Sequence, residues 1–283
     1  MNAVRERRFG LAAVYAAVIY LLLVFLLVAS ALSSGQDAIA QLVRLTFPVS
    51  AVTFYVLPIN SSPVISVPVL LLALVAQVWL LWVVIRGPVA RGEEAGAGTD
   101  LGVRVVRWGL YTFAAAAFLN QLVRLPSNVS VLLGVLLEGW LALGFFRLLP
   151  REFRFHRLFL VGSGMVAAAA TFLRALTFPF GPPVVLDVVK LLQFVGFVWL
   201  ASVVVAQMRD RRWSTPTISL GWVAVLLGAV AFSLDNLFDF GLPDPPFFTL
   251  GQLHVLASIL WAVRSAHELV AVHQVEHDGL KTP

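Results

Sequence analysis

The chain repeats long apolar stretches, each broken from the next by a short segment that carries charge. The hydrocarbon core of a bilayer is about 30 Å thick, and a helix needs about 20 apolar residues to cross it. Lipid offers no water to backbone polar groups, so such stretches cross it as helices. We expect eight spans, at residues 10–33, 66–85, 108–125, 129–147, 158–178, 184–207, 217–238 and 247–264. The sequence therefore predicts an all-α, multi-pass helix bundle in the cell membrane.

Composition supports this prediction and excludes several chemistries. Hydrophobic residues make up 60% of the 283 residues and charged residues only 12%, whereas a soluble domain has about 25% charged residues. The chain has no cysteine, which excludes disulfides, thiolate metal sites and cysteine nucleophiles. The formal net charge of +5 is better explained by basic loops that orient a membrane protein than by nucleic-acid binding.

The basic residues predict one orientation. With the N-terminus in the cytoplasm, only Arg44, Arg124, Arg174 and Lys190 of the 20 lysines and arginines fall outside cytoplasmic segments, as the positive-inside rule requires. The C-terminus is then cytoplasmic too. We expect one integral-membrane domain over 1–283, with a flexible cytoplasmic loop at 86–107 and a cytoplasmic tail at 265–283.

Two alternatives remain near the N-terminus. Residues 40–58 are long enough for a ninth span, but Arg44 and Pro48 favour an outer-surface or re-entrant segment. The first apolar stretch resembles a signal peptide, yet it exceeds the usual 7–15 residues, so we expect it to stay as a helix.

Three segments share a pattern of phenylalanine, polar residues and a turn with proline, at 118–128, 172–183 and 232–246. One interpretation is duplication of an αα-hairpin around a shared centre. The other is that any outward hairpin needs such a turn and that phenylalanine is abundant here. The sequence favours neither.

Polar and charged residues within the predicted spans crowd the half away from the cytoplasm. Charges in a bilayer are costly, so they need partners, water or a function. Asp187, Lys190 and Gln193 recur every three residues on one helical face, and Asp235 and Asp239 share a face of the next span. We expect the two aspartates to pair with outer-half cations across helices. The inner half of the same spans offers only hydroxyls before the basic rim.

These residues predict a shared outward-facing site rather than separate interhelical bonds. The candidate ligand-binding residues are Arg124, Glu138, Arg174, Asp187, Lys190, Gln193, Asp235, Asp239 and His254. Arg174 and Lys190 would hold an anionic group, Glu138 would accept a proton or cation, and His254 would donate or accept a hydrogen bond. We expect no metal and no cofactor, because histidines are too few in the spans for haem or zinc ligation.

Three functions fit such a site. The first is a small ligand or ion bound in an outward-facing cavity, as in a transporter or receptor. The second is an intramembrane enzyme in which Glu138 with Asp187 or Asp235 does acid–base chemistry on a lipid or isoprenoid. The third is a non-catalytic subunit of a larger complex. We favour the first, with membrane lipids as neighbours and an oligomer or larger assembly as an open possibility.

Overall fold

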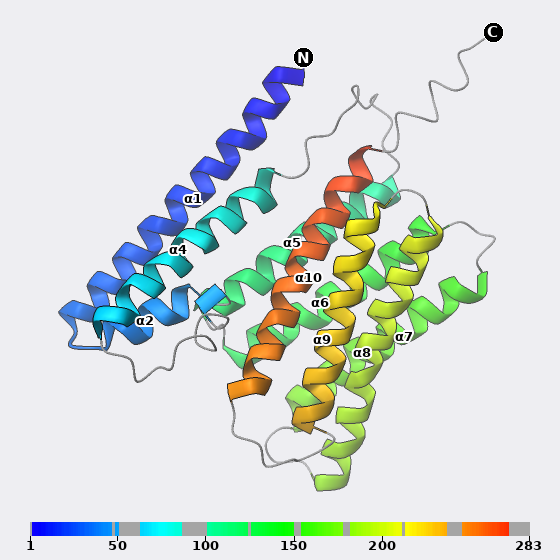
Figure 1. Cartoon of the computed structure of the whole chain (residues 1–283). Helices are drawn as coiled ribbons and strands as arrows, with labels where there is room; N and C mark the ends of the chain where they lie inside the picture. Colours follow the sequence, from blue (N-terminus) through cyan, green and yellow to red (C-terminus); the bar gives the residue numbers. More distant parts are fainter. Residues whose placement is uncertain are drawn as a thin grey trace. The chain divides into compact units, whose positions relative to one another are not determined.

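The computed structural model describes residues 2–46, 49–50, 63–86, 101–123, 126–149, 154–177, 182–210, 213–236 and 245–271. Within these ranges the regular secondary structure is helical, which confirms the all-α prediction (Figure 1). The helices are α1 (Asn2–Ser33), α2 (Ala38–Leu45), α4 (Pro63–Arg86), α5 (Leu101–Val123), α6 (Ser127–Leu148), α7 (Arg154–Thr177), α8 (Pro183–Arg209), α9 (Thr215–Asn236) and α10 (Pro245–Ala271).

Six of the described helices are long and apolar enough to cross a membrane: α1, α4, α6, α7, α8 and α9. Many of their large apolar side chains face outward, such as Phe25, Leu72 and Leu136, as expected where lipid is the solvent. The chain is therefore a multi-pass membrane protein. Helices α5 and α10 cover the predicted spans at 108–125 and 247–264 but are not among the six, so the count of eight stays a prediction.

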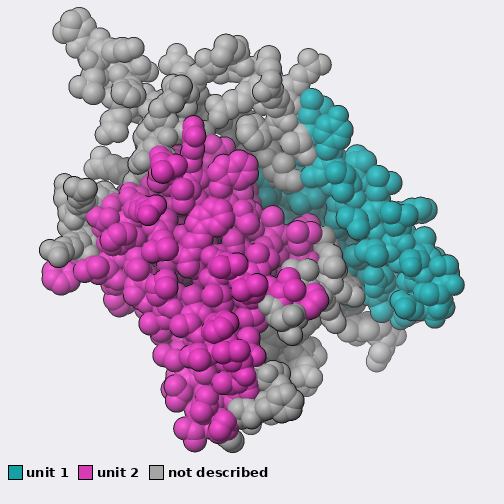
Figure 2. Space-filling model, turned by 180° about the vertical axis from the view of Figure 1, so that it is seen from behind, with its two compact units in different colours: residues 1–91, 121–123 teal, residues 92–120, 124–283 magenta. Residues whose placement is uncertain are grey.

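The chain forms two compact units, coloured separately in Figure 2. Unit 1 contains residues 1–91 and 121–123, and unit 2 contains residues 92–120 and 124–283. The single domain that we expect from the sequence stays a prediction. Helix α5 begins at Leu101, inside the segment 86–107, and residues 87–100 of that segment lie outside the described residues.

Unit 1 is built on α1 and α4, which pack against each other, with α2 beside them. Ala13, Tyr20, Val24 and Ala31 form the buried face of α1, a spacing of seven and four residues that keeps one side of a helix inward. The Tyr20 hydroxyl donates to the backbone carbonyl of Leu45, at the end of α2. At eight residues, α2 is too short to cross a bilayer alone, and residues 51–58 of the doubtful segment 40–58 lie outside the described residues.

Unit 2 contains the functional candidates, and each helix from α6 to α10 packs against the next along the chain. Glycines permit this close packing. A Cβ atom on Gly164 of α7 would lie 2.6 Å from the Ala142 Cβ of α6 and 2.8 Å from the Trp199 Nε1 of α8. Consecutive antiparallel packing suits the predicted hairpins, but duplication itself stays a prediction.

Helix α5 lies against both ends of this series. A Cβ atom on Gly144 of α6 would be 2.9 Å from the Val106 Cγ2 of α5. On its other side, the Tyr111 ring of α5 meets the His267 ring of α10 edge to face, with centroids 5.5 Å apart. Helix α5 thus contacts α6 and α10, the first and last helices of this series.

Candidate functional site

Three of the predicted site residues lie on one face of α8. Lys190 Nζ is 3.7 Å from Asp187 Oδ1, and these two side chains are 39% and 72% exposed. Gln193 follows one turn deeper along the helix. The i, i+3 spacing places all three side chains on neighbouring turns, so the face that the sequence predicts is present.

Arg174, in the last turn of α7, joins this face. Its Nη1 donates a hydrogen bond to Gln193 Oε1 over 2.9 Å. No carboxylate among the described residues lies within ion-pair distance of Arg174. Its hydrogen-bond partner in that part of the chain is a neutral amide. The predicted pairing of Arg174 with Asp235 or Asp239 stays a prediction, because neither aspartate side chain is among the described parts.

Glu138 lies on α6, half-buried, and its nearest polar partner is also on α7. Thr171 Oγ1 donates to Glu138 Oε2 over 3.4 Å, a long and weak hydrogen bond. Thr171 and Arg174 are three residues apart and therefore occupy one side of α7. We call the set Glu138, Thr171, Arg174, Gln193, Lys190 and Asp187 the polar ribbon.

His254 lies on α10, and its hydrogen bond is to α9 rather than to a residue of the polar ribbon. Its Nδ1 is 2.7 Å from the backbone carbonyl of Ala224 on α9. A carbonyl can only accept, so Nδ1 carries the proton and Nε2 keeps its lone pair. Gly228 leaves room for this ring, because a Cβ atom there would lie 2.6 Å from His254 Nδ1.

The predicted site is therefore only partly described. Three separate contacts on α6, α7 and α8 involve the predicted residues: Glu138 with Thr171, Arg174 with Gln193, and Lys190 with Asp187. His254 lies beside α9 and α8 instead. Arg124 and Asp239 are outside the described residues, and of Asp235 only the backbone is described.

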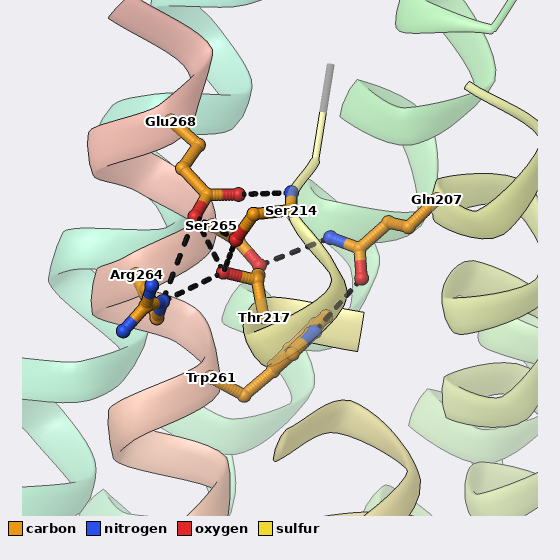
Figure 3. Close-up of polar contacts among 7 residues, drawn as sticks. All are labelled: Gln207, Ser214, Thr217, Trp261, Arg264, Ser265 and Glu268. Atoms are coloured by element: carbon orange, nitrogen blue, oxygen red, sulfur yellow. Dashed lines mark hydrogen bonds and ion pairs between the residues drawn. The ribbon is translucent and has the colours of Figure 1, made fainter. Parts of the chain in front are cut away.

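A second polar cluster, which the sequence reasoning missed, joins α10 to the turn before α9 (Figure 3). Glu268 accepts hydrogen bonds from Ser214 N at 2.8 Å, from Ser214 Oγ at 2.6 Å and from Thr217 Oγ1 at 2.7 Å. Arg264 Nε lies 3.5 Å from the same carboxylate and donates to Thr217 Oγ1 at 3.0 Å. Glu268 thus caps the first turn of α9 from another helix.

Gln207 of α8 extends this cluster inward. Its Oε1 accepts from Trp261 Nε1 at 2.9 Å, and its Nε2 donates to Ser265 Oγ at 3.0 Å. An indole N–H can only donate, so the tryptophan fixes which end of the amide faces it. Gln207 and Ser265 are fully buried, and these two hydrogen bonds join α8 to α10.

The expectation that the inner half of the spans holds only hydroxyls is wrong at this cluster. Gln207 and Trp261 lie in the predicted spans 184–207 and 247–264 and supply a buried amide and a buried indole at the predicted cytoplasmic end. Glu268 belongs to the predicted tail 265–283, but α10 continues to Ala271 and keeps the cluster inside unit 2. A sequence signal exists: His254, Ser258, Trp261, Ser265 and Glu268 recur at intervals of four and three, which marks one face of a helix.

The chain matches no known protein family, no curated protein and no solved structure. What the sites can do follows from their chemistry. Among the described residues no three His, Asp or Glu side chains gather as metal ligands. The Glu268 carboxylate accepts three hydrogen bonds and faces Arg264, whereas among the described side chains Arg174 of the polar ribbon bonds to a neutral amide. The ribbon is therefore the better candidate for ligand binding.

Proposed function

We propose that unit 2 binds a small anionic ligand at the polar ribbon and acts as a transporter- or receptor-like membrane protein. The observation that carries the proposal is the hydrogen bond from Arg174 to Gln193. Arg174 is exposed, so its guanidinium, which has five N–H donors and a permanent charge, is accessible to a ligand while Gln193 holds one of its donors. A carboxylate or phosphate would pair with this charge through two parallel hydrogen bonds.

The neighbouring charges support an anion more than a cation. Lys190 is held by Asp187 at 3.7 Å, so this pair contributes little net charge to the ribbon. The charges that remain in the ribbon are those of Arg174 and Glu138, and of these two Arg174 attracts an anion. In the proposal Gln193 positions the guanidinium, and Lys190 adds a second donor when it turns away from the exposed Asp187.

Glu138 has a different role in the proposal. Its carboxylate, on α6, accepts a hydrogen bond from Thr171, which lies one helical turn before Arg174 on α7. That hydrogen bond is long and therefore weak. A ligand anion at Arg174 would favour a proton on Glu138, because two negative charges close together repel in a medium of low dielectric constant. Glu138 would thereby couple binding of the anion to uptake of a proton.

The described contacts do not favour the enzyme alternative in the same way. Acid–base chemistry by a carboxylate pair needs two such groups close to one substrate. Among the described side chains Glu138 bonds to Thr171 and Asp187 to Lys190, so no pair of carboxylates converges there.

Replacing Arg174 by glutamine is expected to abolish stabilisation of the protein by small anions. The purified protein would be heated with acetate, succinate, sulfate or phosphate at constant ionic strength. A ligand at about 100 times its dissociation constant stabilises the folded state by about 2.7 kcal/mol, which raises Tm by about 5 °C or more in a chain of this size. We expect such a rise with at least one anion in the wild type and none in Arg174→Gln.

Arg147→Gln is the matched control, since Arg147 is an exposed arginine in the last turn of α6, at the opposite end of the bundle. The control should keep the full rise in Tm. Equal rises in all three proteins would show that the anions act on the protein in general, and the proposal would be wrong. A wild type that responds to none of the four anions would also contradict it.

A further inference from the structure

We infer that the ligand is amphipathic, with an anionic head at Arg174 and Gln193 and an apolar body over a phenylalanine cluster deeper along α8. This inference rests on the proposed function and specifies its ligand class. The cluster consists of Phe194, Phe197 and Phe232, and His254 adjoins it.

The polar ribbon and the cluster are continuous on α8. Lys190, Phe194 and Phe197 follow at intervals of four and three residues and so share one face of the helix. Gln193 is next to Phe194 in the chain and holds Arg174 on the neighbouring face. Lys190 and Phe194 are about 6 Å apart along the helix axis, at 1.5 Å per residue. The polar and aromatic side chains are therefore neighbours on α8.

The aromatic cluster consists of side chains from α8 and α9, and it contacts His254 of α10. The ring centroids of Phe194 and Phe197 are 5.9 Å apart, and those rings lie 6.2 Å and 5.7 Å from Phe232 of α9. The His254 ring meets Phe197 edge to face at 5.6 Å. None of these phenylalanines is fully buried, so their edges remain able to contact an apolar ligand body.

His254 gives this apolar region one polar group of fixed direction. Its Nδ1 is committed to the Ala224 carbonyl, and its Nε2 makes no hydrogen bond to the described residues. A ligand that carries a hydroxyl or N–H group on its apolar body would satisfy that lone pair. The region therefore suits an acid with an apolar chain or ring better than it suits an inorganic anion.

Affinity for fatty acids should rise with chain length. The wild-type protein in phosphatidylcholine nanodiscs would be titrated calorimetrically with acetate, butyrate and octanoate, with empty nanodiscs as blank. Burial of about half of the six added methylenes of octanoate predicts binding about 60-fold tighter than that of acetate. Equal affinity for acetate and octanoate would overturn the inference.

Two glycine variants test whether the phenylalanine cluster produces the higher affinity for octanoate than for acetate. A Cβ atom on Gly228 would lie 2.4 Å from Phe197 Cε1, so Gly228→Ala should displace the ring and remove most of the gain. Gly162→Ala is the control, because a Cβ atom on Gly162 meets nothing within 4 Å. If Gly228→Ala fails to fold, Phe194→Leu replaces it and should lower octanoate affinity several-fold with acetate unchanged. Full retention of the octanoate gain in the folded variant would contradict the inference.

A final arm separates a soluble acid from an anionic lipid of the bilayer. The octanoate titration would be repeated in nanodiscs that contain phosphatidylglycerol. About tenfold weaker binding of octanoate there supports the lipid as the natural amphipathic occupant, and unchanged binding supports a soluble acid. If short anions bind through Arg174 without a gain from chain length, the proposed function stands and only this inference fails.

Discussion

Replacing Glu268 by alanine is expected to lower the free energy of unfolding by about 2 kcal/mol, because loss of this largely buried acceptor leaves its hydrogen-bond donors unpaired. The Glu268 side chain is 12% exposed, and its carboxylate is the acceptor for Ser214 N, Ser214 Oγ and Thr217 Oγ1. Its loss leaves these donors without that acceptor and removes the carboxylate that faces Arg264. Unfolding in mixed micelles by titration with dodecyl sulfate measures the change.

Two further variants test whether the effect depends on the charge of Glu268 and on the place of this carboxylate in the cluster. Glu268→Gln keeps an acceptor for Ser214 but loses the charge that faces the start of α9, so it should cost about half as much. Asp187→Ala removes a carboxylate that is 72% exposed and should change stability by less than about 0.5 kcal/mol. Equal effects of Glu268→Ala and Asp187→Ala would contradict the assigned role of Glu268.

Replacing Gln207 by alanine should destabilise unit 2 by about 3 kcal/mol. The substitution removes a fully buried side chain, leaves the Trp261 indole N–H without its acceptor, and opens a space between α8 and α10. A buried unsatisfied donor costs about 1–3 kcal/mol, and the loss of packing adds to that cost. The dodecyl sulfate titration described for Glu268 gives the value.

Gln207→Met keeps the length of the side chain without its hydrogen bonds, so it isolates their contribution at about 1–2 kcal/mol. Gln36→Ala is the control for loss of a glutamine, because Gln36 is exposed after α1. If Gln207→Met were as stable as the wild type, the Trp261 and Ser265 bonds would contribute nothing. The packing of α8 against α10 would then be purely apolar at that level.

Much of the helical framework could be predicted from the sequence. The stretch 184–207 corresponds to α8, Pro183–Arg209, and 129–147 corresponds to α6, Ser127–Leu148, because length and hydropathy alone decide such helices in lipid. The two-unit division could not be predicted, since it depends on which helices pack together. The last two turns of α10 fall in the predicted tail 265–283, because His267 and Glu268 resemble a solvated surface when their partners are not known.

The candidate site shows the same limit. The spacing of Asp187, Lys190 and Gln193 predicted their common face, because a helix fixes it locally. The partners of Arg174 and His254 could not be predicted in this way. Gln193 is 19 residues from Arg174, and the acceptor for His254 is a backbone carbonyl of Ala224, which leaves no mark in the sequence. Gln207 and Trp261, 54 residues apart, escaped prediction for the same reason.

Thiol labelling tests most directly whether Arg174 and Gln193 form an anion site open to the side away from the basic loops. The chain contains no cysteine, so the Thr177→Cys and Gln207→Cys variants each carry a single thiol. Thr177 ends α7, three residues after Arg174, and its replacement leaves Gln193 in place. A membrane-impermeant maleimide added outside intact cells should label Thr177→Cys, more slowly with octanoate present, and should leave Gln207→Cys unlabelled. Labelling of Thr177→Cys only after the membrane is permeabilised, or at a rate that no anion changes, would contradict the proposed site.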